Sequence, residues 1–196
     1  MPQFSSVAVF CGSSSGTEKE HTAQAQALGR LLAHQEKTLV YGGSKIGLMG
    51  ALANACLKAG GKVIGVIPDF LGSREIAHDG LTELIRVDSM HERKMIMHEK
   101  SEAVIALPGG FGTLEELFEM VTWAQLGMHR KPMGVLNVKG YYQELEQFVR
   151  KAIQQGLIHP KNESLLLFEE KPETLIRAMQ NYEAPPSDLQ IRVSRS

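Results

Sequence analysis

The feature that most constrains the fold of this chain is an apolar segment, residues 103–107, that runs into a glycine-rich turn and then an acidic helix. The segment carries no polar side chain and stops at Pro108, which cannot donate a hydrogen bond to a neighbouring strand. Such a run is typical of a strand that is buried on both faces. The sequence therefore predicts a strand, a turn and a helix in this order.

The same order recurs along the chain. Further strands are predicted at residues 7–10, 38–41, 62–67, 84–87, 133–137 and 165–168. Helices are predicted at residues 17–34, 50–59, 90–100, 113–127, 141–155 and 172–182. This alternation implies parallel strands with right-handed crossovers, and hence a doubly wound α/β sheet that binds ligands at the strand carboxyl ends. The glycine-rich turns at residues 12–16, 42–50 and 108–112 should then gather at one edge.

Composition bounds the class of protein. The 196 residues are 43% hydrophobic and 22% charged, which predicts one α/β domain over residues 1–182 and a flexible tail over residues 183–196. The net charge of −1 argues against nucleic acid or an anionic membrane as a partner, so a small ligand is expected. Cys11 and Cys56 are expected to be reduced thiols in a cytoplasmic protein, because no signal peptide or membrane-spanning run is present.

The turn after residue 107 predicts an anion site. Gly109, Gly110 and Gly112 should allow positive φ angles and a close approach of the backbone to a ligand. Thr113 should serve as the N-cap of the next helix. Backbone N–H groups at the positive end of a helix dipole suit a phosphate.

Three carboxylates, those of Glu115, Glu116 and Glu119, follow this predicted anion site directly. A phosphate site has no need of carboxylates, so their presence suggests that positive charge develops beside the phosphate. A structural explanation stays open, because Thr113 and Glu116 have the spacing of a capping box.

Charged residues on two other segments are candidates for the same pocket. Arg74 and Glu75 lie in a polar loop, residues 69–80, that follows a strand. Arg93 and Lys94 lie near the start of helix 90–100, which is expected to turn its methionines inward and its charges outward. If that helix starts at the ligand edge, both side chains reach the pocket. The alternative is that these charges are solvated surface groups.

Other common sites find little support. His91 and His98 are seven residues apart on a helix, which is not the spacing of a zinc motif, so no metal is expected. Residues 12–16 depart from the dinucleotide fingerprint, and Tyr41 and Gly42 stand where an acidic residue would hold a ribose. Phosphate-loop and serine-hydrolase motifs are absent from the sequence.

Helix 113–127 is predicted to have two apolar faces. One consists of Leu114, Leu117, Phe118, Val121 and Ala124. The other consists of Met120 and Trp123, and both faces cannot pack on one sheet. A homodimer is therefore expected, with an internal loop contact as the alternative.

Four separate motifs follow one another along the chain: YGGSKIGLMG at residues 41–50, MHERK at 90–94, PGGFGTLEE at 108–116 and TWAQLG at 122–127. Together they resemble the LONELY GUY family of cytokinin riboside 5′-monophosphate phosphoribohydrolases, which are often mislabelled lysine decarboxylases. The resemblance extends from about residue 7 to residue 168. It implies a dimeric Rossmann-like fold of three layers, and hydrolysis of AMP or N6-modified AMP to an adenine-type base and ribose 5-phosphate without a cofactor.

The resemblance also implies site residues. The catalytic pair falls on Arg93 and Glu116. The residues implied to bind substrate are Glu75, Arg93, Lys94, Gly109, Gly110, Phe111, Gly112, Thr113, Leu114, Glu115, Glu116 and Thr122.

This activity agrees with the carboxylates beside the turn. Cleavage of a ribosyl C–N bond develops oxocarbenium charge, which an ionised Glu116 would stabilise while it orients water. Arg93 would either bind the phosphate or pair with Glu116. The group that protonates the leaving base and the choice between AMP and N6-modified AMP stay open. The alternative functions are a non-catalytic nucleotide or cofactor carrier on the same fold and a NAD-linked enzyme.

Overall fold

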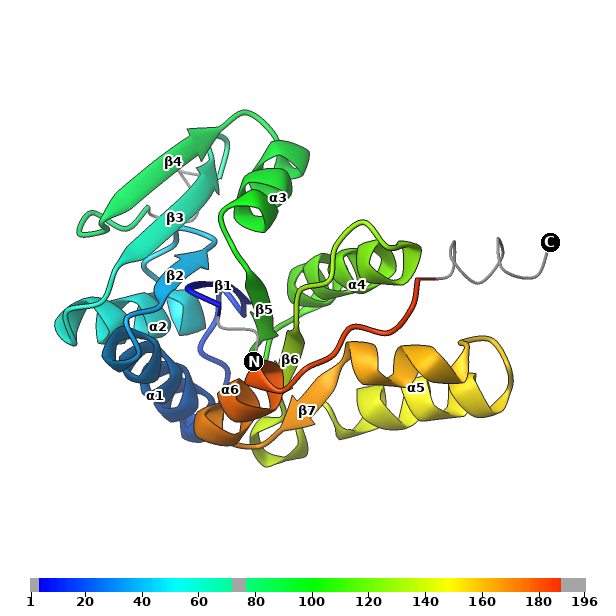
Figure 1. The fold of residues 1–196 in the computed structure, drawn as a ribbon. Helices are drawn as coiled ribbons and strands as arrows, with labels where there is room; N and C mark the ends of the chain where they lie inside the picture. The colour runs from blue at the N-terminus through cyan, green and yellow to red at the C-terminus, as the bar shows by residue number, and fades with distance from the viewer. Residues whose placement is uncertain (1–3, 72–76, 188–196) are drawn as a thin grey trace.

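A computed structural model describes residues 4–71 and 77–187. Within these residues, parallel strands form a seven-stranded sheet in the order β4-β3-β2-β1-β5-β6-β7 (Figure 1). The strands are β1 (Ser6–Phe10), β2 (Thr38–Tyr41), β3 (Val63–Pro68), β4 (Glu83–Val87), β5 (Ala103–Ala106), β6 (Met133–Leu136) and β7 (Leu167–Glu169). The strand order reverses between β1 and β5, as in a doubly wound sheet. The predicted fold class is confirmed.

Helices cover both faces of the sheet, which gives three layers (Figure 1). The helices are α1 (Lys19–His34), α2 (Gly47–Lys58), α3 (Met90–Glu99), α4 (Phe111–Leu126), α5 (Gln143–Gln154) and α6 (Pro172–Gln180), with short 3-10 helices η1 (Val138–Gly140) and η2 (Pro160–Leu165). One core cluster joins α1, α2 and α6 to the sheet, and the other joins α3 and α4 to its opposite face. None of the described helices has the length and apolar character needed to cross a bilayer.

The apolar strands follow from burial on both faces. Along β5, Ala103 and Ile105 belong to the cluster under α1, α2 and α6, while Val104 and Ala106 belong to the cluster under α3 and α4. Side chains alternate between the faces of a strand, so a sheet covered on both sides needs apolar residues at every position. All four residues of β5 are completely buried, as the sequence predicts.

The start of α4 differs from the prediction. The helix begins at Phe111 with Gly110 as its N-cap, and Thr113 lies buried inside the first turn. The N-cap predicted at Thr113 is therefore wrong, and so is the alternative of a capping box that starts there. Positive φ angles are also absent from Gly109, Gly110 and Gly112, so this part of the prediction is wrong as well. Glycine is needed at position 109 for another reason, because a Cβ atom there would lie 2.1 Å from Oγ1 of Thr113.

Two predicted helix faces are also corrected. Met120 packs in the same core cluster as Leu117, so it does not belong to a separate face of α4. Arg93 and Lys94 are buried although α3 was expected to turn its charges outward, and partners on α4 compensate for this burial. Helix α4 therefore does not present the second apolar face from which a dimer was predicted.

The carboxyl-terminal part of the chain begins its elements later than predicted. Tyr141 and Tyr142 precede α5, and β7 starts at Leu167 because residues 160–165 form η2. Within the predicted tail, Arg130 donates to the carbonyl of Ala184 at 3.4 Å and Lys161 donates to that of Pro186 at 2.8 Å. Residues 188–196 lie outside the described residues, and the flexibility of the tail stays a prediction.

Candidate active site

A cavity of about 250 Å³ opens at the carboxyl ends of β1, β2 and β5. Its lining includes Gly12 after β1, Gly42 after β2, and Gly110 and Gly112 after β5. The predicted meeting of three glycine-rich turns at one edge is confirmed. The site also lies at the point where the strand order reverses, which is where doubly wound sheets bind ligands.

The amino-terminal end of α4 forms one wall of the cavity. Gly110 and Gly112 have open space where a Cβ atom would stand, so a ligand can approach this backbone closely. Gly110, Phe111, Gly112 and Thr113 all line the cavity. The first N–H groups of a helix have no partner within the helix and carry the positive end of its dipole. This wall has the chemistry of a phosphate site.

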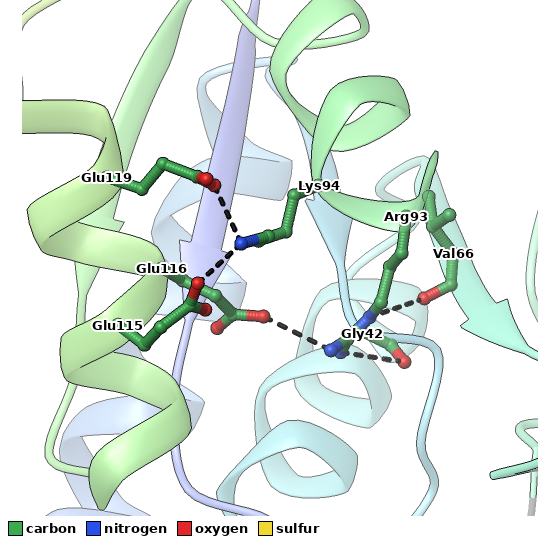
Figure 2. A network of polar contacts seen from close by, with 7 residues as sticks. All are labelled: Gly42, Val66, Arg93, Lys94, Glu115, Glu116 and Glu119. Carbon is green, nitrogen blue, oxygen red and sulfur yellow. Dashed lines mark hydrogen bonds and ion pairs between the residues drawn. The ribbon is translucent and has the colours of Figure 1, made fainter. Parts of the chain in front are cut away.

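A buried ion pair between α3 and α4 forms another part of the lining. Nη1 of Arg93 donates to Oε1 of Glu116 at 3.1 Å, and the two side chains are 9% and 8% exposed. Arg93 also donates through Nε to the carbonyl of Val66 at 3.1 Å and through Nη2 to that of Gly42 at 3.4 Å (Figure 2). The guanidinium is thus fixed on three sides. It pairs with Glu116, which was one of the two roles left open by the sequence.

The position of Arg93 depends on a neighbouring glycine. A Cβ atom at Gly42 would lie 2.0 Å from Nη2 of Arg93. The turn after β2 therefore leaves room for the guanidinium to cross above the strand ends and reach α4. The guanidinium is held by the carbonyls of Val66 and Gly42, so its hydrogen bond to Glu116 keeps the carboxylate in one place.

A second ion-pair cluster links α3 and α4. Lys94 lies between Glu115 and Glu119, with its Nζ atom paired to Oε1 of Glu115 and lying 2.9 Å from Oε2 of Glu119 (Figure 2). Burial by itself lowers the pKa of Lys94, but the hydrogen bonds and charges of the two glutamates raise it overall. Lys94 stays protonated, and its cluster braces the two helices that carry Arg93 and Glu116.

Cys11 contributes an uncharged group to the cavity lining. Burial is the main cause that raises the pKa of the Cys11 thiol far above its usual range, and the charge of Glu116 raises it further. The thiol is therefore protonated and unsuited to act as a nucleophile. Among the described residues that line the cavity, Glu116 supplies the only carboxylate.

Comparison with known proteins places the chain in a family. A family profile described as "Possible lysine decarboxylase" matches residues 49–179. Cytokinin riboside 5′-monophosphate phosphoribohydrolase LOG7 of Arabidopsis thaliana is 45% identical over 92% of this chain and 83% of its own length. The probable phosphoribohydrolase LOGL9 of Oryza sativa subsp. japonica is 46% identical over 92% of this chain and 79% of its own length. The chain belongs to the LONELY GUY family.

Solved structures agree with this membership at the level of the fold. The Moco carrier protein of Chlamydomonas reinhardtii has a TM-score of 0.70 at 21% identity, covering 91% of this chain and 97% of its own. The molybdenum cofactor binding protein of Rippkaea orientalis has a TM-score of 0.68 at 23% identity, covering 92% and 98%. At these identities the likeness supports the Rossmann-like fold alone.

Not every residue implied by LONELY GUY membership lies at the cavity. Gly109 and Leu114 are absent from its lining, as are Lys94 and Glu115. Thr122 is exposed on α4, where its hydroxyl donates to the carbonyl of Phe118 at 2.8 Å. Glu75, together with Arg74, lies outside the described residues. The substrate contacts assigned to all these residues stay predictions.

The cavity of this LONELY GUY protein also has lining residues that the sequence analysis did not assign to the site. Cys11 follows β1 directly, so its position at a strand carboxyl end was the signal that could have identified it. Met97 belongs to a core cluster, as expected, and both Met97 and Met90 also line the cavity. Among the described residues, no group of three or more potential metal ligands occurs. His98 instead packs its ring edge-on against Trp123 at 5.2 Å.

Proposed function

We propose that this LONELY GUY family member hydrolyses the N-glycosidic bond of AMP or N6-modified AMP, yielding an adenine-type base and ribose 5-phosphate. The observation that carries the proposal is the placement of the buried Glu116 carboxylate in the same cavity as the open amino-terminal turn of α4. Glu116 lies about one helical turn beyond that end, so one ligand can contact both. The names of LOG7 and LOGL9, which describe action on cytokinin riboside 5′-monophosphates, support this substrate class.

In the proposed reaction, the 5′-phosphate binds to the backbone N–H groups at the start of α4. The bond between the anomeric carbon and the base nitrogen breaks, and its electron pair leaves with the base. Glu116 stabilises the resulting oxocarbenium charge and accepts a proton from the water that attacks the anomeric carbon. Glu116 then releases the proton it took from water to the solvent, the departing base takes up one proton from the solvent, and the products are free base and ribose 5-phosphate. This chemistry requires neither a metal nor a cofactor.

Arg93 has a positioning role in this proposal. Its hydrogen bonds to Val66 and Gly42 hold the guanidinium in place, and its bond to Glu116 then fixes the carboxylate. A preorganised charge contributes more to catalysis than one that must reorient during the reaction.

Product analysis tests the function. The purified protein is incubated with AMP and with N6-isopentenyl-AMP, and free base and ribose 5-phosphate are measured by chromatography. The proposal predicts release of both products by the wild type and a severe loss in Glu116→Ala. Nucleotide binding without base release, in the wild type and Glu116→Ala alike, would favour the carrier function of the Moco carrier fold neighbours.

We also propose that the protein forms a homodimer and acts in the cytoplasm. The dimer is supported by exposed apolar side chains on α3 and α4 or next to them, namely Met95, Leu126 and Met128. The compartment is supported by the two buried free cysteines. Sedimentation equilibrium should give a mass near 43 kDa, about twice the 21.6 kDa of one chain. A mass of one chain at micromolar concentration would refute the dimer.

A further inference from the structure

Three successive carbonyl groups in the turn after β5 accept hydrogen bonds from outside that turn. The hydroxyl of Tyr142 donates to the carbonyl of Leu107 at 2.8 Å. The backbone N–H of Gly12 donates to that of Pro108 at 3.1 Å. The hydroxyl of Tyr141 donates to that of Gly109 at 2.7 Å. Adjacent tyrosines thus fix the carbonyls on either side of Pro108.

The turn after β6 delivers the two tyrosines to this place. Strand β6 lies next to β5, so the segment that follows it passes beside the glycine-rich turn. Lys139 and Gly140 adopt positive φ angles of 51° and 75°, which reverse the chain direction tightly. The N–H of Tyr142 then donates to Oδ1 of Asn137 at 2.7 Å and closes the turn.

The two tyrosines sit in different surroundings. Tyr142 is 3% exposed, and burial raises the pKa of its phenol, so it remains a neutral hydrogen-bond donor. Tyr141 is 45% exposed, and the edge of its ring faces His21 at 5.3 Å. Core packing accounts for the buried ring of Tyr142. It does not account for the half-exposed Tyr141, whose hydroxyl lies 2.7 Å from the carbonyl of Gly109.

The geometry of the peptide bond gives these contacts a consequence for the cavity. In a trans peptide, the carbonyl of one residue and the N–H of the next point in opposite directions. A hydrogen bond that fixes the carbonyl of Gly109 therefore also fixes the N–H of Gly110, which lines the cavity. The carbonyl is at the same time kept away from an anionic ligand, which it would repel.

We propose that Tyr141 and Tyr142 are positioning residues for the phosphate group, because their hydroxyls orient the peptide planes of the turn that receives it. The inference rests on the proposed function for the identity of the ligand as a 5′-phosphorylated nucleotide. Neither tyrosine contacts the reacting atoms. Each acts through the backbone at Leu107 or Gly109, and Tyr141 has the more direct effect because it fixes the plane that contains the Gly110 N–H.

The test removes single hydroxyl groups. Tyr141→Phe leaves a half-exposed ring in place, whereas Tyr142→Phe leaves a buried carbonyl without its donor and is expected to lower the melting temperature as well. Tyr182→Phe is the matched control, because its buried hydroxyl has no hydrogen-bond partner among residues 4–71 and 77–187. Isothermal titration calorimetry of each protein measures binding of ribose 5-phosphate, AMP and adenosine. Binding of ribose 5-phosphate, the proposed product, does not depend on turnover. AMP and adenosine are titrated and compared in proteins that also carry Glu116→Gln, which is expected to slow hydrolysis without changing binding.

Loss of one positioning hydrogen bond is expected to weaken binding of ribose 5-phosphate and AMP about three- to ten-fold in Tyr141→Phe. Adenosine binding should stay within about two-fold, and Tyr182→Phe should bind all three ligands as the wild type does. The proposal is overturned if Tyr141→Phe binds ribose 5-phosphate like the wild type, or if AMP and adenosine lose affinity equally. A wild type that binds ribose 5-phosphate in this tyrosine-dependent way but releases no base would refute the proposed function and leave the positioning role intact.

Discussion

Replacing Glu116 with glutamine should abolish most of the hydrolytic activity while leaving nucleotide binding nearly unchanged. Glutamine keeps the shape of the side chain and an oxygen that can accept the hydrogen bond from Arg93. It removes the negative charge that the proposed reaction places beside the sugar cation. The hydrogen bonds to the phosphate, which are assigned to backbone N–H groups at the start of α4, are not altered.

The size of the effect follows from the surroundings of the carboxylate. Glu116 is buried in a polar site, for which an effective dielectric constant of about 20 is suitable, so a unit charge about 4 Å away interacts by about 4 kcal/mol. Each 1.36 kcal/mol corresponds to about a factor of ten in rate, which gives a loss of about 10³-fold. Arg93, at 3.1 Å from Oε1, offsets part of this charge. A fall of kcat by about 10²- to 10³-fold is therefore expected.

Steady-state release of base from AMP, with KM and kcat determined separately, measures this effect. Glu119→Gln is the matched control, because Glu119 lies on the same helix, is 25% exposed and pairs with Lys94 rather than Arg93. The control should keep kcat within a few-fold of the wild type. The reasoning is refuted if Glu116→Gln retains a third or more of the wild-type kcat, or if Glu119→Gln loses as much.

Four further predictions follow from the site and its surroundings. Adenosine, which lacks the phosphate, should be cleaved at least about 10²-fold less efficiently than AMP, and equal kcat/KM values would exclude the phosphate site. Gly109→Ala should lower the free energy of unfolding in urea by about 1–3 kcal/mol, because its Cβ would meet Thr113. Gly110→Ala, whose Cβ would meet no protein atom, should weaken AMP binding in calorimetry without loss of stability. Phe111→Ala should leave the melting temperature unchanged, since its side chain is 93% exposed, but should raise the KM for AMP, and an unchanged KM would remove Phe111 from the site. Burial, aided by the charge of Lys131, lowers the pKa of His98 from 6.5 to about 4. As the pH falls from 7 to 5, the imidazole therefore binds a proton in the unfolded chain but not in the folded protein, which should lower the free energy of unfolding by about 1–2 kcal/mol. Thermal melts should find a smaller loss over this pH range in His98→Gln.

The fold could be predicted largely because burial on both faces leaves a plain signal in the sequence. The residues of β5 are apolar at every position, and the glycines after β1, β2 and β5 mark the edge where the cavity lies. The predicted start of α4 is wrong because the pattern of a capping box at Thr113 lies just inside the true start of the helix, where Gly110 is the N-cap. Thr113 and Glu116 have the spacing of a capping box, yet Gly110 takes the extended conformation of an N-cap at φ −96° and ψ −151°, and the helix begins three residues earlier than a cap at Thr113 would place it.

The parts that escaped prediction depend on contacts between distant segments. The burial of Arg93 and Lys94 contradicts the usual exposure of charged residues, and only the partners on α4 explain it. Tyr141 and Tyr142 gave no local signal, because their hydroxyls bond to carbonyls 32 and 35 residues away. That contact exists because β6 pairs with β5, and strand order is not encoded in the periodicity of either strand.

The most direct test of the account is a crystal structure of Glu116→Gln with bound AMP. The account predicts that the phosphate oxygens accept hydrogen bonds from backbone N–H groups of residues 110–113, and that the amide of the substituted residue reaches the anomeric carbon directly or through one water. A phosphate held elsewhere, or a residue 116 side chain turned away from the sugar, would contradict it.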